Sequence, residues 1–341
     1  MTTTSSPDYA LAGHPPGASA GGLQILPAAP GGSGSAAWAA EHRDAVRARI
    51  AESGAVLLRG LGVASAAEVA GIAGGLGIEP LIEREGFAAR SSYAKGVYSS
   101  SQWPPDEPMC MHHELSYAAE VPGLILFGCL TAPAKGGKTE IADAQQVLRA
   151  LPAELVAPFE RDGWLLTRMY HEIGVPWSDA FGTEDPAQVD AYCAAAGLER
   201  EWLPEGRLRT RQRRAAVLRH PRTGVPGWFN QIAFLNELTL DPAIRGYLTD
   251  VYGPSGLPFN TAYGDGKPVS GDIVETINEV YRQATIAEPW RSGDVLVVDN
   301  LRMAHSREPY EGAREIVVIF GEPARLTGHV LPCPAIAGGQ S

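Results

Sequence analysis

The order of apolar and polar positions predicts a helical N-terminal part in which one short strand separates two helices. Residues 39–53 contain neither Gly nor Pro, and Val46 and Ile50, four positions apart, share one face of a helix. The continuous apolar run 55–59 predicts a short buried strand. Ser65 follows where its hydroxyl can cap the next helix by accepting a backbone N–H of the first turn. We therefore expect helices that flank a sheet.

From about residue 87 the pattern changes to short apolar runs separated by Gly and Pro, which is typical of a β-rich fold. Strands are predicted at 96–100, 124–130, 139–142, 164–170, 295–299 and 316–321. Helices are predicted at 144–151, 186–195 and 271–284. The predicted fold class is therefore mainly β, with flanking helices packed on a double-sheet barrel.

Changes in composition indicate the boundaries of the folded part. Residues 1–36 are dominated by Ala, Gly, Ser, Thr and Pro, so we expect a loose N-terminal tail, in which residues 23–26 are able to form a short strand. Residues 37–330 are expected to form a single domain, followed by a C-terminal tail at 331–341. The stretch 171–260 is more polar and irregular, and we interpret it as a long insertion that contributes to a lid.

Composition and charge narrow the function classes. The chain has 341 residues, 45% of them hydrophobic and 20% charged, which supplies ample material for a core. Its formal net charge of -11 disfavours nucleic acid as a partner. No apolar run approaches the ~18 residues that cross a bilayer, and the N-terminus has no basic targeting signal, so no membrane partner is expected. The 4 cysteines form no CxxC pair, which argues against a zinc cluster or disulfide scaffold and favours a cytoplasmic location.

Two histidines and one glutamate provide the donor set of a metal site. Side chains two apart in an extended segment point the same way, so His112 and Glu114 face one side and His113 the other. His305 follows the buried strand predicted at 295–299, and only the fold can bring it to the first pair. Three protein ligands on an octahedral metal leave three positions, two for a chelating oxo-acid and one for dioxygen, as in non-haem Fe(II) oxygenases.

Two other classes remain open on these residues alone. Two His and one Glu also form catalytic zinc sites, so a zinc-dependent hydrolase is a rival interpretation. The zinc motif HExxH is absent, because Leu115, Ser116 and Tyr117 follow His113 and Glu114. A jelly-roll binding protein without catalysis is the third class, although an intact set of ligands argues against it.

Two residues near the predicted metal ligands could hold an oxo-acid. Arg314 opens the apolar strand predicted at 316–321, and its guanidinium can hold a carboxylate with two parallel hydrogen bonds. Thr139 offers a hydroxyl beside the tight turn formed by Gly136 and Gly137. A carboxylate held between Arg314 and Thr139, with the oxo-acid end on the metal, matches what 2-oxoglutarate requires.

These segments together resemble the taurine dioxygenase-like (TauD/TfdA) family of Fe(II)/2-oxoglutarate-dependent oxygenases, and most of all the branch that includes the syringomycin-biosynthesis hydroxylase. The resemblance extends from about residue 87 to 323 and more loosely back to Ala55. It is carried by MHHELSY, GGKTEIADAQQVLRALP, GWFNQIAFLN, YGDGKPVSGDIVETI and WRSGDVLVVDNLRMAHSREPYEGAREIVVIFGEP. The family fold is a double-stranded β-helix, or jelly roll, so the resemblance implies this core for the present chain.

The resemblance also assigns roles to residues. By position, His112, Glu114 and His305 match the iron ligands of the family, and Thr139 and Arg314 match its oxo-acid contacts. The branch often has Asn at the position of His113. Residues expected near the substrate are Ser101, His113, Asn230 and Arg307. Their alternatives are strand packing for Ser101, a buried or solvent-facing histidine for His113, backbone hydrogen bonding for Asn230, and an ion pair with Glu308 or Asp299 for Arg307.

The function implied by the resemblance is oxidation by Fe(II), 2-oxoglutarate and O2. We expect hydroxylation of an unactivated C–H bond in an amino acid or an amino-acid-derived substrate of specialised metabolism, with release of succinate and CO2. Desaturation or cyclisation by the same cofactors is an alternative outcome. Related halogenases replace the carboxylate ligand by a small residue to admit chloride, and Glu114 argues against that activity here. The substrate is expected either free or tethered to a peptidyl carrier protein, which the basic run 207–214 could attract, although such a run is more often a solvated face.

Overall fold

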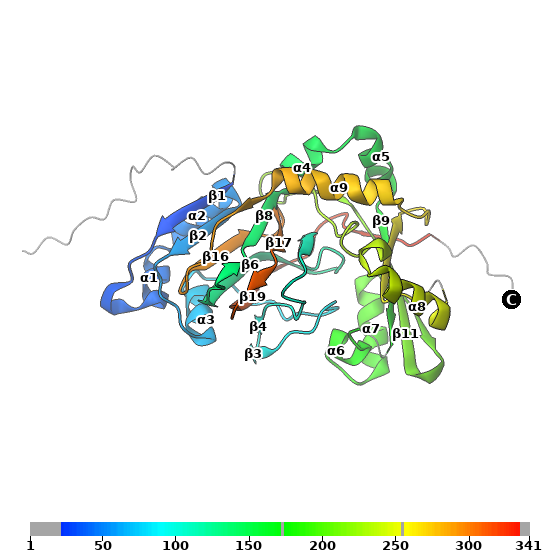
Figure 1. Ribbon diagram of the computed structural model, residues 1–341, viewed down its shortest axis with the longest axis horizontal. Coiled ribbons are helices and arrows are strands. Elements are labelled where there is room, and N and C mark those ends of the chain that lie inside the picture. Colours follow the sequence, from blue (N-terminus) through cyan, green and yellow to red (C-terminus); the bar gives the residue numbers. More distant parts are fainter. Residues whose placement is uncertain (1–21, 172–173, 254–255, 335–341) are drawn as a thin grey trace, which may run out of the picture.

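The computed structural model describes residues 22–171, 174–253 and 256–334, and the predicted tails therefore lie partly outside the described residues. Figure 1 shows a central pair of sheets, with the N-terminal helices at one end and a third sheet at the other. The central pair positions the candidate site.

The first sheet has seven strands in the order β1-β2-β16-β6-β19-β4-β3. In that order the strands are β1 (Leu23–Pro27), β2 (Ala55–Arg59), β16 (Val295–Asp299), β6 (Val121–Thr131), β19 (Glu315–Ala324), β4 (Val97–Ser99) and β3 (Ser92–Ala94). Alternate residues of β2 face opposite sides, as the period of a strand requires. Ala55 and Leu57 join the core between the sheets, whereas Val56 and Leu58 pack toward the N-terminal helices.

Those helices are α1 (Ser35–Glu41), α2 (Arg43–Ser53) and α3 (Ala66–Gly75), which cover the outer face of the first sheet. The single helix predicted over 39–53 is in fact two, because the chain leaves helical geometry at His42. The predicted cap at Ser65 is confirmed, since its side chain accepts the backbone N–H of Glu68. A side chain in place of Gly128 would overlap Val69, so glycine permits the close approach of α3 to β6.

The second sheet has the order β15-β8-β17-β5 and faces the first across a shared apolar core. Its strands are β15 (Ile286–Ala287), β8 (Thr139–Asp143), β17 (Met303–Arg307) and β5 (Met109–His112). The helices α4 (Ala144–Ala150) and α9 (Gly271–Ala284) cover its outer side (Figure 1). A two-stranded ribbon of β7 (Lys135–Gly136) and β18 (Tyr310–Glu311) adjoins it. This arrangement confirms the predicted mainly β fold with flanking helices.

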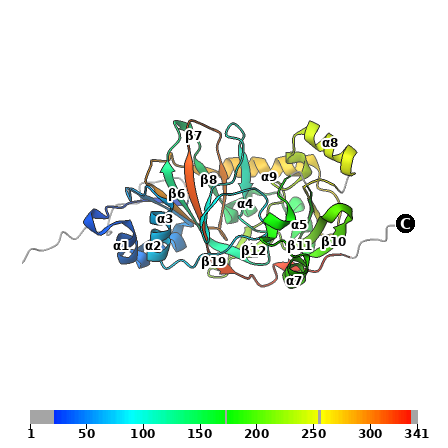
Figure 2. The same cartoon turned by 90° about the horizontal axis from the view of Figure 1, so that it is seen from below.

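The predicted insertion is not irregular, because most of it forms a third sheet with its own helices. This sheet has the order β10-β11-β9-β14, and β20 pairs with β11. Its strands are β9 (Trp164–Tyr170), β10 (Glu199–Leu203), β11 (Arg207–Arg214), β14 (Phe259–Tyr263) and β20 (Val330–Leu331). The remaining elements of this region are α5 (Ala153–Asp162), α6 (Trp177–Phe181), α7 (Pro186–Ala196), β12 (Val217–Arg219), β13 (Pro226–Trp228) and α8 (Pro242–Tyr252). Figure 2 shows the third sheet with α7 and α8 at the end opposite to α1 and α2.

The predicted N-terminal tail is shorter than 1–36. The strand β1 pairs in parallel with β2 over its whole length, from Leu23 opposite Ala55 to Pro27 opposite Arg59. The apolar residues of this segment are thereby tied into the first sheet, and residues 1–21 lie outside the described part. At the other end, β20 pairs with β11, so the predicted C-terminal tail at 331–341 begins inside a strand.

The basic run 207–214 forms β11, with alternate residues buried. Its outward arginines have partners nearby, because Arg209 pairs with Glu201 and Arg211 with Glu199 on the neighbouring strand β10. Cross-strand pairs of opposite charge neutralise the surface of a sheet. The run is therefore a paired face of the third sheet and not an unneutralised basic patch.

Candidate metal centre and its cavity

The two histidines of the predicted triad lie on neighbouring strands of the second sheet. His112 ends β5, His305 stands in the middle of β17, and the antiparallel register places the two directly opposite each other. Directly opposed residues share one face of a sheet. Their ring centroids are 4.3 Å apart, and both side chains are buried. The fold thus brings together two imidazoles that are far apart in sequence.

Glu114 lies two residues beyond His112, just after the end of β5. Glu114 Oε2 is the carboxylate oxygen nearest to both imidazoles. It lies 4.0 Å from His112 Nε2 and 3.7 Å from His305 Nε2. The chain turns sharply at this point, and Leu115 adopts a positive φ of 52°. The predicted alternation is therefore confirmed: His112 and Glu114 face the same side, and His305 joins them.

Hydrogen bonding, burial and neighbouring charges set the protonation states of His112 and Glu114. His112 Nδ1 lies 2.8 Å from the backbone oxygen of Cys110, so a proton on Nδ1 leaves the Nε2 lone pair facing Glu114. Burial, together with the nearby His305, lowers the pKa of His112 to about 3. Burial acts to raise the pKa of Glu114, but the Arg90 guanidinium and His305 outweigh it and lower the pKa to about 2. A neutral imidazole and a carboxylate anion are the forms that bind a metal.

The three side chains fit a divalent metal ion. One ligand atom from each lies within 4.8 Å of the others, and all three residues are buried. The converging donors are Nε2 of His112, Nε2 of His305 and Oε2 of Glu114, two imidazole nitrogens and one carboxylate oxygen. Bonds of about 2.0–2.2 Å place neighbouring donors of a metal roughly 3 Å apart, so a small inward movement would close the site. Two His and one carboxylate with open positions suit Fe(II).

Asn300 holds the segment that carries Glu114, and sequence reasoning did not assign it this part. Its side-chain oxygen accepts the backbone N–H of Glu114 at 2.9 Å, and its amide donates to the backbone oxygens of Glu114 and Pro122. Asn300 is fully buried in the turn between β16 and β17. It therefore couples Glu114 to the strand that carries His305. The only feature of the sequence that could have indicated this role is an Asn directly after the buried strand predicted at 295–299.

Arg90 is the second residue that sequence reasoning missed. Its Nη2 donates to Glu114 Oε2 at 3.2 Å, and its Nε lies 3.4 Å from Glu83 Oε2. The side chain is 7% exposed. Arg90 comes from the irregular segment before β3, where a single arginine among small residues gives no signal of its position. It supplies the positive charge beside the carboxylate of the candidate metal centre.

A cavity between the two central sheets extends from the three candidate ligands. Its lining includes four residues that the sequence placed near the oxo-acid or substrate: Ser101, Thr139, Arg307 and Arg314. Thr139 begins β8 directly opposite Arg307 of β17, and Arg314 precedes β19 of the facing sheet. The structure thus gathers two hydroxyls and two guanidinium groups beside His112, Glu114 and His305.

Three arginines line this cavity, and among the described residues two of them, Arg307 and Arg314, have no acidic partner, whereas Arg90 pairs with Glu114. Arg314 Nε donates to the backbone oxygen of Gly137, and Arg307 donates to the backbone oxygens of Trp103, Pro104 and Glu107. The alternative ion pair of Arg307 with Glu308 or Asp299 does not form among these residues, since Glu308 pairs with Lys138 and Asp299 with Arg222 and His220.

The uncompensated positive charge of this cavity suits an anion. Burial, with the charge of Arg307 added, lowers the pKa of Arg314 to about 10, still well above neutrality. Arg307 and Arg314 donate only to backbone oxygens, and two buried guanidinium groups that lack an acidic partner are costly unless an anion binds them. A dicarboxylate such as 2-oxoglutarate supplies one.

His113 and Asn230 do not line this cavity, and their place near the substrate stays a prediction. His113 is fully buried on the opposite side of β5, with Nδ1 2.6 Å from the backbone oxygen of Asn300 and its ring against Phe229. Asn230 donates to the backbone oxygen of Ala216 and accepts the backbone N–H of Ile232. Both residues match their alternative interpretations, a buried histidine and an amide that satisfies buried backbone groups.

Aromatic side chains enclose the other side of His112. Phe234 stacks on the imidazole with ring centroids 4.6 Å apart, and Phe87 meets it edge-on at 6.1 Å. Trp103 packs against Phe234 in turn. Trp103 Nε1 is buried with no hydrogen-bond partner among the described residues. This apolar wall excludes water from one side of the candidate ligands.

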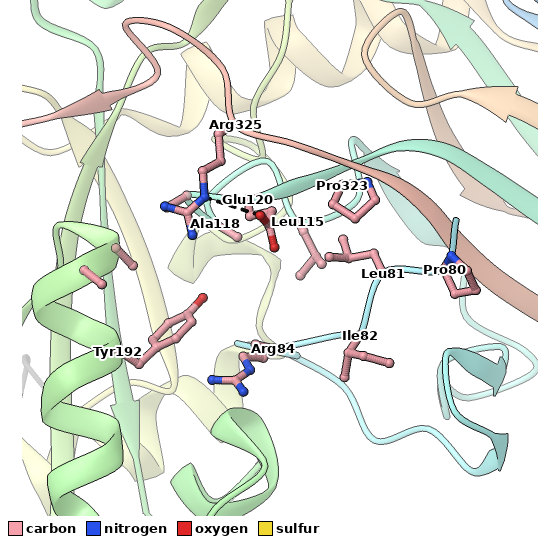
Figure 3. Close-up of a pocket in the computed structure, with 13 residues that line it drawn as sticks. Pro80, Leu81, Ile82, Arg84, Leu115, Ala118, Glu120, Tyr192, Pro323 and Arg325 are labelled. Atoms are coloured by element: carbon pink, nitrogen blue, oxygen red, sulfur yellow. Dashed lines mark hydrogen bonds and ion pairs between the residues drawn. The ribbon is translucent and has the colours of Figure 1, made fainter. Parts of the chain in front are cut away.

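A second cavity, of about 380 Å³, lies behind the turn that follows Glu114. Figure 3 shows Arg84 and Tyr192 on one side and the ion pair of Glu120 with Arg325 on the other. Leu115 is the residue of the Glu114 turn that reaches it. None of the three candidate ligands lines this second cavity, so it is separate from the metal centre.

Comparison with known proteins agrees with this geometry. The family model described as "Taurine catabolism dioxygenase TauD, TfdA family" matches residues 23–320. The chain belongs to this family. A TauD-family protein is an Fe(II)/2-oxoglutarate-dependent oxygenase that uses O2, and the His112, Glu114 and His305 group lies where such a protein needs a metal. The zinc-hydrolase and non-catalytic alternatives are thereby set aside.

Individual relatives support the same assignment. The dapdiamide synthesis protein DdaC of Enterobacter agglomerans is 34% identical over 275 residues, which cover 80% of this chain and 84% of the relative. A clavaminate synthase-like protein of Arabidopsis thaliana is 29% identical over 277 residues, covering 78% and 81%. The crystal structure of PvcB from Pseudomonas aeruginosa aligns with a TM-score of 0.52 at 16% identity, over 91% of this chain and 90% of that one. This TauD-family chain therefore shares their overall fold, the predicted double-stranded β-helix.

Two further predictions concern location. Among the described residues, no helix of this TauD-family protein is long and apolar enough to cross a membrane. The 4 cysteines, Cys110, Cys129, Cys193 and Cys333, are all free in the described part of the chain. The expected absence of a disulfide scaffold is therefore consistent with the structure, whereas the cytoplasmic location stays a prediction.

Proposed function

We propose that the protein hydroxylates an unactivated C–H bond of an amino acid or amino-acid-derived substrate in specialised metabolism, releasing succinate and CO2. The observation that carries this proposal is the buried group of two imidazoles and one carboxylate beside two arginines that lack an acidic partner. The relative named for dapdiamide synthesis supports a biosynthetic role. The carboxylate of Glu114 occupies the position that related halogenases leave open for chloride, and this supports oxygen insertion in preference to halogenation.

In this proposal each residue has a defined part. His112, Glu114 and His305 bind Fe(II), and Thr139 and Arg314 bind the far carboxylate of 2-oxoglutarate. Bound iron supplies the oxidation, in which one atom of O2 enters the substrate C–H bond and the other enters 2-oxoglutarate, which loses CO2 and becomes succinate. Arg314 offers a planar fork for the carboxylate, which a lysine cannot match.

The other residues of the cavity orient the substrate and exclude water. Ser101 and Arg307 line the cavity and remain the candidates for polar contacts with the substrate. Met109, Phe127, Ile316 and Val318 give the cavity its apolar lining, which favours a substrate that presents an aliphatic or aromatic portion to the metal. A substrate tethered to a peptidyl carrier protein remains a second form of the same proposal.

The test is substrate-dependent succinate formation. Amino acids, both free and attached to a carrier protein, are supplied with Fe(II), 2-oxoglutarate and ¹⁸O2, and products are analysed by mass spectrometry. The expected result is a product that gains one labelled oxygen atom in proportion to succinate, with no signal from a His305→Ala control. A product that loses two hydrogens without gaining oxygen identifies desaturation or cyclisation instead. A halogenated product from the unmodified protein in chloride or bromide overturns the proposal.

A further inference from the structure

The carboxylate of Glu114 has two oxygens, and the number that reaches the metal decides how many positions stay open. A carboxylate that binds through one oxygen leaves three of six positions for a chelating oxo-acid and O2. A carboxylate that binds through both oxygens consumes one of those three. The chain therefore needs a device that controls the rotation of the Glu114 carboxylate.

The two oxygens of the Glu114 carboxylate have different contacts. Oε2 is the oxygen nearest to both imidazoles and also accepts the hydrogen bond from Arg90 Nη2 at 3.2 Å. Oε1 is buried with no hydrogen-bond partner among the described residues. Since a terminal carboxylate torsion is broad and roughly two-fold, nothing intrinsic to Glu114 fixes its rotation. The described hydrogen bond that orients this carboxylate comes from Arg90.

Arg90 is itself held on two other sides. Its Nε lies 3.4 Å from Glu83 Oε2, and its guanidinium carbon lies 5.1 Å from the centre of the Phe320 ring on β19. The backbone of Glu83 is fixed in turn, because its N–H donates to the Tyr98 hydroxyl at 3.1 Å. The contact with Glu83 is an ion pair and not a hydrogen bond, and together with the hydrogen bond to Glu114 and the ring of Phe320 it restricts the orientation of the planar guanidinium. Burial raises the pKa of Glu83 to about 7 although Arg90 lowers it, so near neutrality Glu83 offsets part of the charge that Arg90 places beside a metal cation.

We propose that Arg90 is a positioning residue that fixes the rotation of the Glu114 carboxylate, so that Oε2 alone faces the metal and three coordination positions remain open. This inference rests on the proposed assignment of His112, Glu114 and His305 as the metal ligands. Arg90 acts through Glu114 and through its own anchor Glu83. Neither Arg90 nor Glu83 is required to touch the oxo-acid or the substrate.

The test uses Co(II), which reports its ligand set in visible absorption and does not support turnover. The variants are Arg90→Gln, which removes the charge and the fork, and Arg90→Lys, which keeps the charge. The matched control is Arg59→Gln, because Arg59 also pairs with a buried carboxylate, that of Asp294 at 3.1 Å, but lies outside the cavity. Each protein is titrated with Co(II) and then with 2-oxoglutarate.

The expected result in Arg90→Gln is a changed Co(II) spectrum before 2-oxoglutarate is added and a Co(II) affinity lowered about ten- to a hundredfold, as for other partners of metal ligands. Binding of 2-oxoglutarate to the Co(II) form is expected to weaken as well. Arg90→Lys is expected to give a Co(II) spectrum and a 2-oxoglutarate affinity between those of Arg90→Gln and the wild type. If Arg90→Gln does not fold, Arg90→Lys is compared with the wild type instead. Arg59→Gln is expected to keep both the wild-type spectrum and the wild-type affinity.

Two outcomes contradict the inference, and they are distinguishable. A wild-type spectrum and wild-type 2-oxoglutarate affinity in both Arg90 variants overturn the role of Arg90 while leaving the ligand assignment intact. Wild-type Co(II) affinity in a His305→Ala variant overturns the ligand assignment, and the role of Arg90 with it.

Discussion

The two sides of the candidate metal centre are built differently. On one side His112 and His305 lie opposite each other on paired strands, so the backbone ladder of β5 and β17 places both imidazoles. On the other side Glu114 lies past the end of β5, where Asn300 holds its backbone and Arg90 holds its carboxylate. The imidazole side depends on strand pairing, whereas the carboxylate side depends on two single side chains.

This difference indicates where the centre is easily perturbed. A strand pair tolerates many substitutions because its register is fixed by backbone hydrogen bonds and by the apolar pattern on its buried face. A loop held by a buried amide and a buried guanidinium loses its geometry when either partner is removed, because the remaining polar groups stay buried and unpaired. We therefore expect the carboxylate side to be the more sensitive to changes outside the ligands.

Removal of a ligand gives the largest expected effect. His305→Ala leaves a two-ligand site, and we expect the affinity for Fe(II) or Co(II) to fall by roughly a hundredfold or more, beyond the range seen for partners of ligands. Isothermal titration with Co(II) measures the change. Met303→Ala, on the same strand, is the control for disruption of β17 alone, and equal metal affinities in the two variants would contradict the assignment.

Asn300→Ala sharpens the comparison, because it affects the carboxylate side alone. The substitution leaves the buried N–H and C=O of Glu114 without their partner, and we expect a loss of about 2–4 kcal/mol in the free energy of unfolding. Hydrogen exchange should quicken at the amide of Glu114 and stay slow in the ladder between β5 and β17. Equally faster exchange on both sides would show that the two sides are one unit.

Substitution of Arg314, at the end of the cavity where we expect 2-oxoglutarate to bind, gives the next smaller expected effect. A charge-assisted fork contributes about 1.5–3 kcal/mol, so we expect Arg314→Ala to weaken 2-oxoglutarate binding by about ten- to a hundredfold. Arg314→Lys should weaken 2-oxoglutarate binding less than Arg314→Ala does, because lysine keeps the positive charge. Titration of the Co(II) form with 2-oxoglutarate measures both. If Arg307→Ala alone had this effect, the carboxylate anchor would move to Arg307.

The smallest effect is expected far from the metal centre, on the paired arginines of β11. Arg209 and Glu201 form a partly exposed ion pair, so Arg209→Gln should change the free energy of unfolding by no more than about 0.5 kcal/mol. Binding of Co(II) and 2-oxoglutarate should not change. A defect confined to carrier-tethered substrates would instead identify β11 as a docking surface for the carrier.

The sequence predicted those parts of the fold and site that depend on local pattern. The apolar runs of β2, β16 and β19 and the alternation that pairs His112 with Glu114 are visible within a few residues. The strand β11 was missed because its side chains are long and basic, so a period of two was hidden by uniform charge. Its buried residue Arg214 finds partners in Tyr117, Ala196 and Gln212, which lie on other elements or two residues away.

Long-range contacts account for what local patterns could not predict at the site. Neither Arg90 nor Asn300 stands near Glu114 in sequence, and neither residue type is unusual in its own segment. Their roles arise only when the fold closes around the carboxylate. His113 shows how local patterns can point two ways, because adjacency to His112 and Glu114 suggested a place near the substrate while strand alternation turns its side chain to the opposite face.

The hydrogen bond between Glu114 and Asn300 also has a consequence for the order of events in biosynthesis of the protein. It joins residues 186 positions apart, a separation that makes the contact slow to form. An emerging chain holds His112 and Glu114 long before it contains Asn300 and His305, so no translation intermediate offers a complete iron site. Iron that binds only the finished fold stabilises it by mass action. We therefore expect the finished chain to unfold less readily with a bound metal than without one.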